Sequence, residues 1–486
     1  MGGLFFCRSK ALRRGPHIDH NHFSMTEFDA TVVGGGPNGL AAGVELARAG
    51  RKTLLIEAAD QIGGGTRTEE LTLPGFLHDV CSAIHPAGVA SPYFREIDLE
   101  IDWINSPLPV AHPLDGGRAA VVHRSVDETA ETLGEDSDWY RKLMTPIVEN
   151  IDEYVDVALG PITLVPKHIG EFTRLGIYGG LPAAALAKRF NTEEGKGLFA
   201  GIAAHAIAPF YGLATSAVGL MLGAIAHSHG WPLARGGSQS ISHALASRFE
   251  SLGGKIELGR TVESVDELGT GPVFLDVMPP AAFRIARNRI APSKARRLSR
   301  WQPGPGIFKI DWALDAPIPW ADPSSGMAAT VHLGGRYAEV AASERAVARG
   351  DHPRRPFVLL AQQSLFDGSR APEGKHTAWG YCHVPNGSDL DMTHAIENQV
   401  ERFAPGFKDI VIERATRTTS AYERYNANYV GGDIGGGEYG LKKVLQIGSK
   451  SPYDLGGDVY LCSSATPPGA GVHGMCGYYA ARAYLG

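Results

Sequence analysis

The feature that most constrains the fold of this chain is a glycine-rich turn between a short apolar strand and a helix near the N-terminus. Residues 30–33 are apolar and mostly β-branched, which predicts a buried parallel strand. A G-x-G-x-x-G turn formed by Gly34, Gly36 and Gly39 follows directly. The first glycine allows the tight turn, the second lets the backbone approach a pyrophosphate, and the third lets the helix pack close to the strand. This order predicts a dinucleotide-binding domain.

The residues after the turn complete the motif. The sequence predicts a helix over 40–49 and a second strand over 52–56. The first N–H groups of such a helix point at bound phosphates, so we assign Pro37 and Asn38 to the cofactor site together with the glycines. Glu57 lies about 20 positions after the first glycine, where a carboxylate accepts hydrogen bonds from ribose hydroxyls. The same charge disfavours NADP, because it would repel a 2′-phosphate.

A second glycine cluster covers residues 63–67 and reads Gly-Gly-Gly-Thr-Arg. Its small residues let another backbone segment approach the phosphate arm of the cofactor, and it resembles the double-glycine motif of the FAD-dependent amine oxidase and phytoene desaturase superfamily. We assign Gly64, Gly65, Thr66 and Arg67 to the cofactor site. Gly65 stands where an arginine often follows the glycine pair in that superfamily. The alternative is therefore a plain glycine turn followed by a surface arginine.

The C-terminal segment GAGVHGM carries three more glycines, which let the main chain pass close to a flat ligand. A helix is predicted to start near His473, and the N–H groups of 472–475 would then stabilise negative charge that develops on a flavin ring. His473 is either a catalytic acid or a capping side chain, and we favour the structural role. From this end we assign Ser464, Gly471, Val472, His473 and Met475 to the cofactor site. Val262 is expected beside the adenine.

Composition limits the class of protein. The chain has 486 residues, enough for two domains with a large core, and its 43% hydrophobic and 20% charged residues are typical of a globular protein. The net charge of -6 gives no basic field, so we expect no nucleic-acid partner. Five cysteines occur without any CxxC spacing, which excludes a dithiol redox site and the common zinc ribbons. No metal site is predicted.

The chain divides into a discontinuous first domain and an inserted second one. The first domain is predicted from 26–105, 230–290 and 440–486, and its middle segment reads as a glycine turn, an amphipathic helix and two short strands. The second domain is predicted from 106–229 and 291–439. It combines helices over 140–230 with antiparallel strands over 306–315, 357–367 and 377–385. The expected fold class is α/β, with a Rossmann-like doubly wound domain and an antiparallel-sheet plus helical substrate domain.

Two further segments bear on location. Residues 1–25 are basic and precede the first strand, and we interpret them as a disordered tail, with a presequence as the alternative. Residues 198–234 contain no Asp, Glu, Lys or Arg, a run long enough to span a bilayer. A proline, several glycines and three histidines interrupt it, so we expect buried helices around a lipophilic tunnel. A membrane-surface entry patch is the alternative.

Several stretches together resemble one known family. They include GFLHDVCSAIHPAGVASPYF, GPGIFKIDWALDAPIPW, NANYVGGDIGGG and the C-terminal LCSSATPPGAGVHGMCGY. The chain resembles, over nearly all of 26–486, the phytoene dehydrogenase-related branch of the FAD-dependent amine oxidase superfamily. The resemblance implies a two-domain fold that binds FAD and oxidoreductase activity. It does not supply a substrate.

Two residues are the catalytic candidates. Lys309 lies in a strand that resembles the strand of amine oxidases whose lysine is bridged by water to flavin N5. The alternative is a strand lysine that faces solvent. His85 follows the double-glycine motif closely enough to pass near the flavin face, where it could orient substrate. His376, Tyr381 and His383 face the pocket or point away from it, depending on the register of their strand.

The expected function is hydride removal from a carbon–hydrogen bond of a lipophilic, isoprenoid-like substrate to flavin N5. A flavin amine oxidase and a flavin-bound scaffold protein without turnover are the alternatives. The expected partners are the lipophilic substrate and a membrane surface, and the sequence allows a homo-oligomer. A bacterial protein of this kind is expected in the cytoplasm. The animal members of the branch are associated with mitochondria, which implies the mitochondrial matrix for a eukaryotic one.

Overall fold

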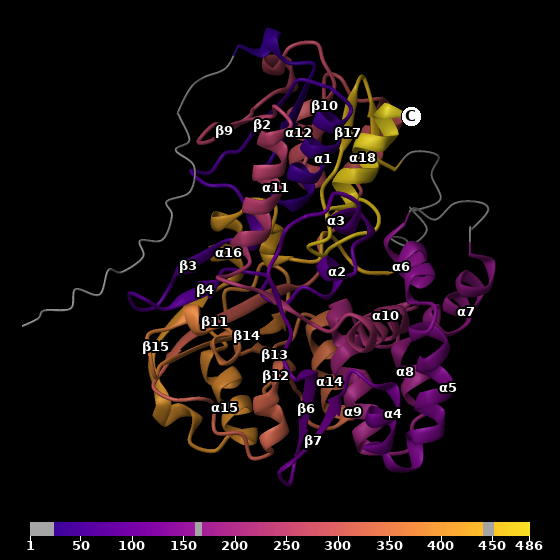
Figure 1. Ribbon diagram of the computed structural model, residues 1–486, viewed down its shortest axis with the longest axis vertical. Coiled ribbons are helices and arrows are strands. Elements are labelled where there is room, and N and C mark those ends of the chain that lie inside the picture. The colour runs from indigo at the N-terminus through magenta and orange to yellow at the C-terminus, as the bar shows by residue number, and fades with distance from the viewer. Residues whose placement is uncertain (1–23, 161–167, 441–451) are drawn as a thin grey trace, which may run out of the picture.

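The computed structural model describes residues 24–160, 168–440 and 452–486. Its first layer is a six-stranded sheet at one end of the molecule, opposite a second sheet at the other end (Figure 1). Neighbouring strands of the first sheet run parallel, except that the strand Asp454–Gly456 at one edge is antiparallel to its neighbour Val459–Leu461. In spatial order the strands are β16 (Asp454–Gly456), β17 (Val459–Leu461), β10 (Val273–Leu275), β1 (Ala30–Val33), β2 (Thr53–Ile56) and β9 (Lys255–Glu257).

Helices cover both faces of this sheet. One face carries α1 (Pro37–Arg48), α11 (Gln239–Ser251) and the C-terminal α18 (Met475–Leu485), which lies beside α1 although the two are far apart in sequence (Figure 1). The other face carries α12 (Pro279–Ala286) and α13 (Pro292–Leu298). The expected doubly wound α/β class is thereby confirmed.

Two local predictions need correction. Helix α1 begins at Pro37, three residues before the predicted start, because Gly36 is an extended N-cap and proline is well suited to the first helical position. After α11 only β9 forms, where two short strands were expected. Residues 258–264 run as irregular chain past the ends of β2 and β9. Residues 1–23 of the tail predicted over 1–25 lie outside the described residues, as does 441–451 within the third segment of the first domain.

The second sheet has seven strands and belongs to the inserted segments. Neighbours are antiparallel except β12 and β6. In spatial order they are β15 (Val411–Arg417), β11 (Gly306–Leu314), β14 (His376–Val384), β13 (Val358–Ala361), β12 (Ala328–Leu333), β6 (Leu108–Leu114) and β7 (Arg118–Val122). One face packs on α15 (Thr393–Phe403), with Phe308, Trp312 and Phe403 in the core. The opposite face turns toward the helices.

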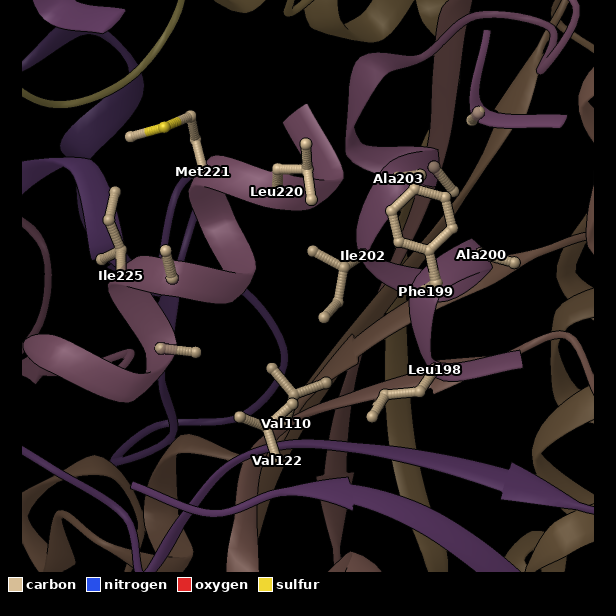
Figure 2. Packing of buried hydrophobic residues seen from close by; sticks show 14 of the residues in the cluster. Val110, Val122, Leu198, Phe199, Ala200, Ile202, Ala203, Leu220, Met221 and Ile225 are labelled. Atoms are coloured by element: carbon tan, nitrogen blue, oxygen red, sulfur yellow. The ribbon is translucent and has the colours of Figure 1, made fainter. Parts of the chain in front are cut away.

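The helices opposite the second sheet come from residues 137–228, and only the last two α-helices of this stretch reach into the uncharged run over 198–234. They include α5 (Ser137–Val148), α6 (Ile151–Leu159), α7 (Ile169–Gly179), α9 (Glu193–Ala203) and α10 (Thr215–Ser228). Figure 2 shows Leu198 and Ile202 of α9 packed toward Val110 and Val122 of the sheet, with α10 alongside. Among the described residues no helix is both long enough and apolar enough to cross a bilayer. The uncharged run is thus a pair of core helices, which explains its hydrophobicity.

Candidate functional site

One cavity of about 1080 Å³ connects the two halves of the molecule. It begins at the carboxyl ends of β1 and β2, where parallel sheets of this type bind their ligands, and extends to the second sheet and to helices α6, α7 and α10. Pockets for drug-sized ligands are roughly 300–1,000 Å³, so this cavity has room for more than one small molecule. Most of the residues assigned from sequence line it: Gly34, Gly36, Pro37, Asn38, Glu57, Gly64, Gly65, Thr66, Arg67, His85, Val262, Ser464, Gly471 and Val472.

The glycine turn is sterically closed to any other residue at two positions. A Cβ on Gly39 would lie 2.0 Å from the carbonyl oxygen of Gly34. Gly34 itself has φ +105° and would place a Cβ 2.8 Å from the carbonyl oxygen of Asp276 on the next strand. The turn is therefore held against both α1 and β10. Gly39 does not line the cavity, and its role is this close packing.

Glu57 is fixed by backbone donors at the end of β2. Its Oε2 accepts a hydrogen bond from the N–H of Gly35 at 2.6 Å, and its Oε1 accepts one from the N–H of Ala59 at 2.9 Å. Each carboxylate oxygen can accept more than one hydrogen bond, so Glu57 keeps acceptor capacity toward the cavity that it lines. This geometry suits recognition of vicinal ribose hydroxyls.

The second glycine cluster touches the first. A Cβ on Gly64 would lie 3.2 Å from Cα of Gly36, so the two loops bring bare backbone together at the cavity wall. Arg67 is 5% exposed, which excludes the surface arginine of the alternative reading. Its Nη2 donates to the carbonyl of Gln61 at 2.8 Å and lies 3.8 Å from Glu57 Oε1, and its guanidinium stacks over Tyr425. Arg67 thus braces this corner of the site and also lines it.

Asp276 is a site residue that the sequence reasoning missed. It follows β10, lines the cavity, and accepts a hydrogen bond from the Gly39 N–H through Oδ2 at 2.9 Å. Burial raises the pKa of this carboxyl to about 7, with Glu57 adding to the effect and the Gly39 hydrogen bond opposing it. The available signal was an acid at the carboxyl end of an apolar stretch. It could be used only once β10 was known to lie beside β1.

At the C-terminal end, Gly471 and Val472 line the cavity, and α18 begins at Met475, two residues after the predicted start. His473 is 1% exposed, and its Nδ1 accepts a hydrogen bond from the Met475 N–H at 3.0 Å. Burial lowers the pKa of His473 to about 4, so the ring is a neutral acceptor that caps the helix. Neither His473 nor Met475 lines the cavity.

His85 lines the cavity as a neutral, tethered imidazole. Ser238 Oγ donates to the carbonyl of Ser82 at 2.6 Å and therefore accepts from His85 Nε2 at 2.8 Å. Its Nδ1 is turned toward Ser82 Oγ at 3.4 Å. Burial lowers the pKa of His85 to about 4. Because both nitrogens face serines of the protein, His85 offers its ring rather than a proton donor to the cavity.

Lys309 is fully buried, which excludes the solvent-facing alternative. Its Nζ pairs with the carboxylate of Asp311 and lies 5.3 Å from the centroid of the Trp379 ring. Burial lowers the pKa of Lys309 and raises that of Asp311, and their mutual attraction opposes both shifts. Lys309 does not line the cavity, whereas Trp379 does. The lysine therefore lies one layer behind the wall.

The far part of the cavity is apolar. Helices α6, α7 and α10 contribute Val155, Ala158, Leu175, Gly179, Ala217 and Met221. The second sheet contributes Thr330, Leu359, Trp379 and Tyr381. His383 lies on the same face of β14 as Tyr381 but is bonded to Glu344, with Nδ1 2.8 Å from Oε2, away from the cavity lining. The described residues contain no group of three His, Cys, Asp or Glu side chains arranged to hold a metal ion.

The residues present fit a dinucleotide of the FAD kind. Asn38 lines the cavity at the start of α1, and its buried Oδ1 has no hydrogen-bond partner in the described structure, so a ligand donor has an acceptor to meet. Glycine backbone forms two adjoining walls, and Arg260 and Arg284 bring positive charge to the same end. From this end the cavity continues to the apolar walls of α7 and α10.

Comparison with known proteins agrees with this geometry. Residues 32–97 match the family model described as NAD(P)-binding Rossmann-like domain. The chain is 25% identical to rat (Rattus norvegicus) pyridine nucleotide-disulfide oxidoreductase domain-containing protein 2, over 94% of this chain and 93% of the relative. It is 23% identical to the lycopene-forming phytoene desaturase of Paracoccus sp., over 96% of this chain and 98% of that protein.

Solved structures show the same fold. An oxidoreductase from Methanosarcina mazei matches with a TM-score of 0.65 at 15% identity, covering 94% of this chain and 99% of that one. A triple mutant of putrescine oxidase matches with a TM-score of 0.60 at 17% identity, covering 94% and 97%. The homologues of this chain are thus oxidoreductases that include a phytoene desaturase, and the solved structures that share its fold include amine oxidases. The resemblance expected from the sequence is thereby confirmed.

Proposed function

We propose that this protein is an FAD-dependent oxidoreductase of the phytoene desaturase type. It removes a hydride from a carbon–hydrogen bond of a lipophilic, isoprenoid-like substrate, and a second hydrogen leaves as a proton. Bound FAD supplies the hydride acceptor at N5, and oxygen, a quinone or another acceptor regenerates it. The homology to phytoene desaturase and the putrescine oxidase fold both support this assignment.

The observation that carries the proposal is the continuity of the cavity. The same space that touches Gly36, Glu57 and Val472 reaches the apolar walls of α7 and α10. A bound dinucleotide and a long apolar substrate would therefore meet inside the protein, where water is excluded and an electron-rich cofactor is protected from side reactions. A closed, short pocket would have favoured a scaffold protein instead.

The chain's own residues bind the cofactor and orient the substrate. Glu57 and the two glycine loops hold the nucleotide end, and the main chain at Gly471 and Val472 passes along the cavity wall near the N-terminus of α18. The helix end favours negative charge at that wall. His85, anchored by Ser238, fixes the shape of the opposing surface. Lys309 acts through Trp379 and is a positioning residue.

The stacked aromatic pair on the sheet wall does not form the cage that would favour amine oxidation. An aromatic cage requires two rings that face each other across an open slot. The stacked pair in the described lining, Trp379 and Tyr381, has centroids 5.6 Å apart with an interplanar angle of 21°, which leaves no space for a substrate carbon between them. Long apolar substrates suit the walls better.

We also propose a peripheral contact with a membrane surface. Helix α7 lines the cavity through Leu175 and Gly179, while its Ile169 and Ile177 are 65% and 59% exposed. Tyr211 and Leu213 add exposed apolar surface. Flotation with phospholipid vesicles tests this contact, and loss of flotation in Ile169→Ser/Ile177→Ser is the expected result. A cytoplasmic or mitochondrial-matrix location follows from the source, bacterial or eukaryotic.

The proposed function is tested by anaerobic absorbance spectroscopy of the purified protein. We expect flavin bands that bleach on addition of isoprenoid or related lipids but persist with amines or NADPH. Bleaching by amines alone would establish the amine oxidase alternative. A protein without FAD, even after reconstitution, would refute the assignment.

A further inference from the structure

The second sheet contributes residues with polar side chains to the lining of the cavity. Thr330 of β12, Ala361 of β13 and Trp379 of β14 stand in one row across the sheet, since Ala361 is the register partner of both. Tyr381 lies two residues further along β14 on the same face. Thr330, Trp379 and Tyr381 line the cavity, and the short side chain of Ala361 separates the first two.

Two polar atoms of this row have no partner within the described structure. Thr330 Oγ1 and Trp379 Nε1 are buried and make no hydrogen bond, and their residues are 1% and 3% exposed. An unsatisfied buried hydroxyl or indole N–H is costly, whereas a ligand oxygen that bonds to it removes the cost. By contrast, Asp433, which also lines the cavity, already accepts hydrogen bonds from the N–H groups of Gly304 and Gly437.

The surroundings of the row are electrically neutral. No Asp, Glu, Lys or Arg is among the cavity-lining residues of α6, α7, α10, β12, β13 and β14 in the described chain. His205 also lines this part, and burial lowers its pKa to about 3, with His383 adding to the effect, so its ring carries no charge at neutral pH. Lys309, a buried charge behind Trp379, is paired with Asp311. A carboxylate or ammonium group would lose its hydration here without gaining a counter-ion.

The rest of this region accepts hydrocarbon. Val155, Leu175, Ala217 and Met221 project from three helices into the same space. A ligand that contacts both the sheet wall and the space between the three helices therefore has a lipophilic chain and a single uncharged oxygen function.

We propose that the substrate is a neutral oxygenated lipid, an alcohol or carbonyl compound rather than a pure hydrocarbon, an acid or an amine, and that Trp379 Nε1 and Thr330 Oγ1 bind its oxygen. The inference rests on the proposed function and deepens it, because it names the substrate class for the same cavity. The oxygen lies on the sheet wall and the chain lies between α6, α7 and α10.

The test is a binding titration of the FAD-loaded protein with farnesol, farnesene, farnesoic acid and farnesylamine. The change in flavin absorbance on binding is the readout. These probes share one chain and differ in the head. We expect wild-type protein to bind farnesol at least about tenfold more tightly than the acid or the amine, since a buried unpaired charge is costly. Equal or tighter binding of either charged probe would overturn the proposal.

Variants then locate the oxygen. Thr330→Val removes one hydroxyl at nearly constant shape, whereas Trp379→Phe removes the indole N–H together with part of the ring. Each is expected to weaken farnesol relative to farnesene by about threefold to tenfold. Thr377→Val and Trp139→Phe are matched controls, because Thr377 Oγ1 and Trp139 Nε1 are also buried without partners but do not line the cavity. These controls should leave both probes unaffected.

The outcomes separate the two claims. A purified protein that holds no FAD refutes the proposed function and this inference with it. A protein that holds FAD and is reduced by isoprenoid hydrocarbons, but whose Thr330 and Trp379 variants weaken farnesol and farnesene equally, refutes only the present inference. FAD content and melting temperature of every variant confirm that each is folded.

Discussion

Asp276 holds the N-terminal turn of α1 through one hydrogen bond, from the Gly39 N–H to its Oδ2 at 2.9 Å. The N-terminus of this helix is where a dinucleotide pyrophosphate binds in folds of this type. An acid and an anionic ligand therefore approach the same helix end. Burial raises the pKa of Asp276 to about 7, and Glu57 and the Cys462 thiol are its titratable neighbours. Near neutral pH this carboxyl is partly protonated.

This arrangement predicts that FAD affinity falls as pH rises. The protonated carboxyl tolerates a pyrophosphate, whereas the ionised form repels it, so FAD binding takes up a proton. The dissociation constant should increase by up to about tenfold per pH unit above pH 7. Titration of apoprotein with FAD between pH 6 and pH 9 measures it. Asp276→Asn should flatten the profile, and Glu397→Gln, a buried acid far from the cavity, should retain it; a flat wild-type profile contradicts the prediction.

The same shift has a defined effect on stability without FAD. The pKa in the folded state, about 7, lies above the ordinary value of 3.8. Between these values the unfolded chain has lost its proton and the folded protein keeps it, so the free energy of unfolding falls as pH rises through this window. Asp276→Asn should reduce this slope in urea titrations at pH 4 to pH 8. A steeper slope in the variant would show that another group is responsible.

Replacement of Gly39 by alanine should abolish FAD binding. A Cβ at this position would lie 2.0 Å from the Gly34 carbonyl oxygen, so the strand and helix must separate. We expect a loss of about 3 kcal/mol or more in the free energy of unfolding, at the upper end for overpacked cores. Gly170→Ala is the control, since its Cβ meets nothing within 4 Å and lies in α7. Urea unfolding and flavin content are the measurements, and a Gly39→Ala protein that keeps its flavin would contradict the steric argument.

The buried Lys309–Asp311 pair should behave as a unit. Lys309→Met leaves the Asp311 carboxylate buried without its partner and should cost about 3–5 kcal/mol of unfolding free energy, and Asp311→Leu should cost a similar amount. The double variant should recover most of this loss, because no lone charge remains. Lys375→Met, which breaks an exposed pair with Asp315, should change stability by less than about 1 kcal/mol. Guanidinium unfolding of the wild type, the two single variants and the double variant gives the coupling energy between Lys309 and Asp311. Additive losses of unfolding free energy would contradict the prediction.

Local motifs made part of this structure predictable. The turn at Gly34–Gly39 and the acid Glu57 could be read from sequence, because the whole motif lies within residues 30–57. The strand that carries Lys309 could be read from its own residue pattern. The burial of Arg67 was harder to predict, because it depends on Tyr425, which tertiary packing brings to it. The burial of Lys309 likewise depends on Trp379 of the paired strand β14. Only one of the two short strands predicted after α11 formed, and its three residues, 255–257, pair with β2.

Residues fixed by strand order could not be found. Asp276 reaches the site only because β10 pairs with β1, a relationship between residues about 240 positions apart that no local pattern encodes. The polar row of Thr330 and Trp379 likewise depends on the register of three strands. One-residue shifts would have turned these side chains to the opposite face. The burial of the uncharged run over 198–234, by contrast, could be predicted from sequence, because it depends on composition and not on strand order.

The apolar part of the cavity can be closed without touching the nucleotide end. Met221 and Ile225 project from one side of α10, and Leu220 projects from the side that faces α9 (Figure 2). Because Met221 lines the cavity, Met221→Trp adds bulk to the substrate region. We expect farnesol binding to weaken by at least about tenfold while FAD content stays at the wild-type level. The reason is that overpacking the apolar part of the cavity costs roughly 1–3 kcal/mol. Met327→Trp, on the surface at 47% exposure, should change neither quantity. Stopped-flow reduction of the flavin by substrate provides a second readout, and a Met221→Trp protein that binds and reduces like wild type would show that lipids enter by another route.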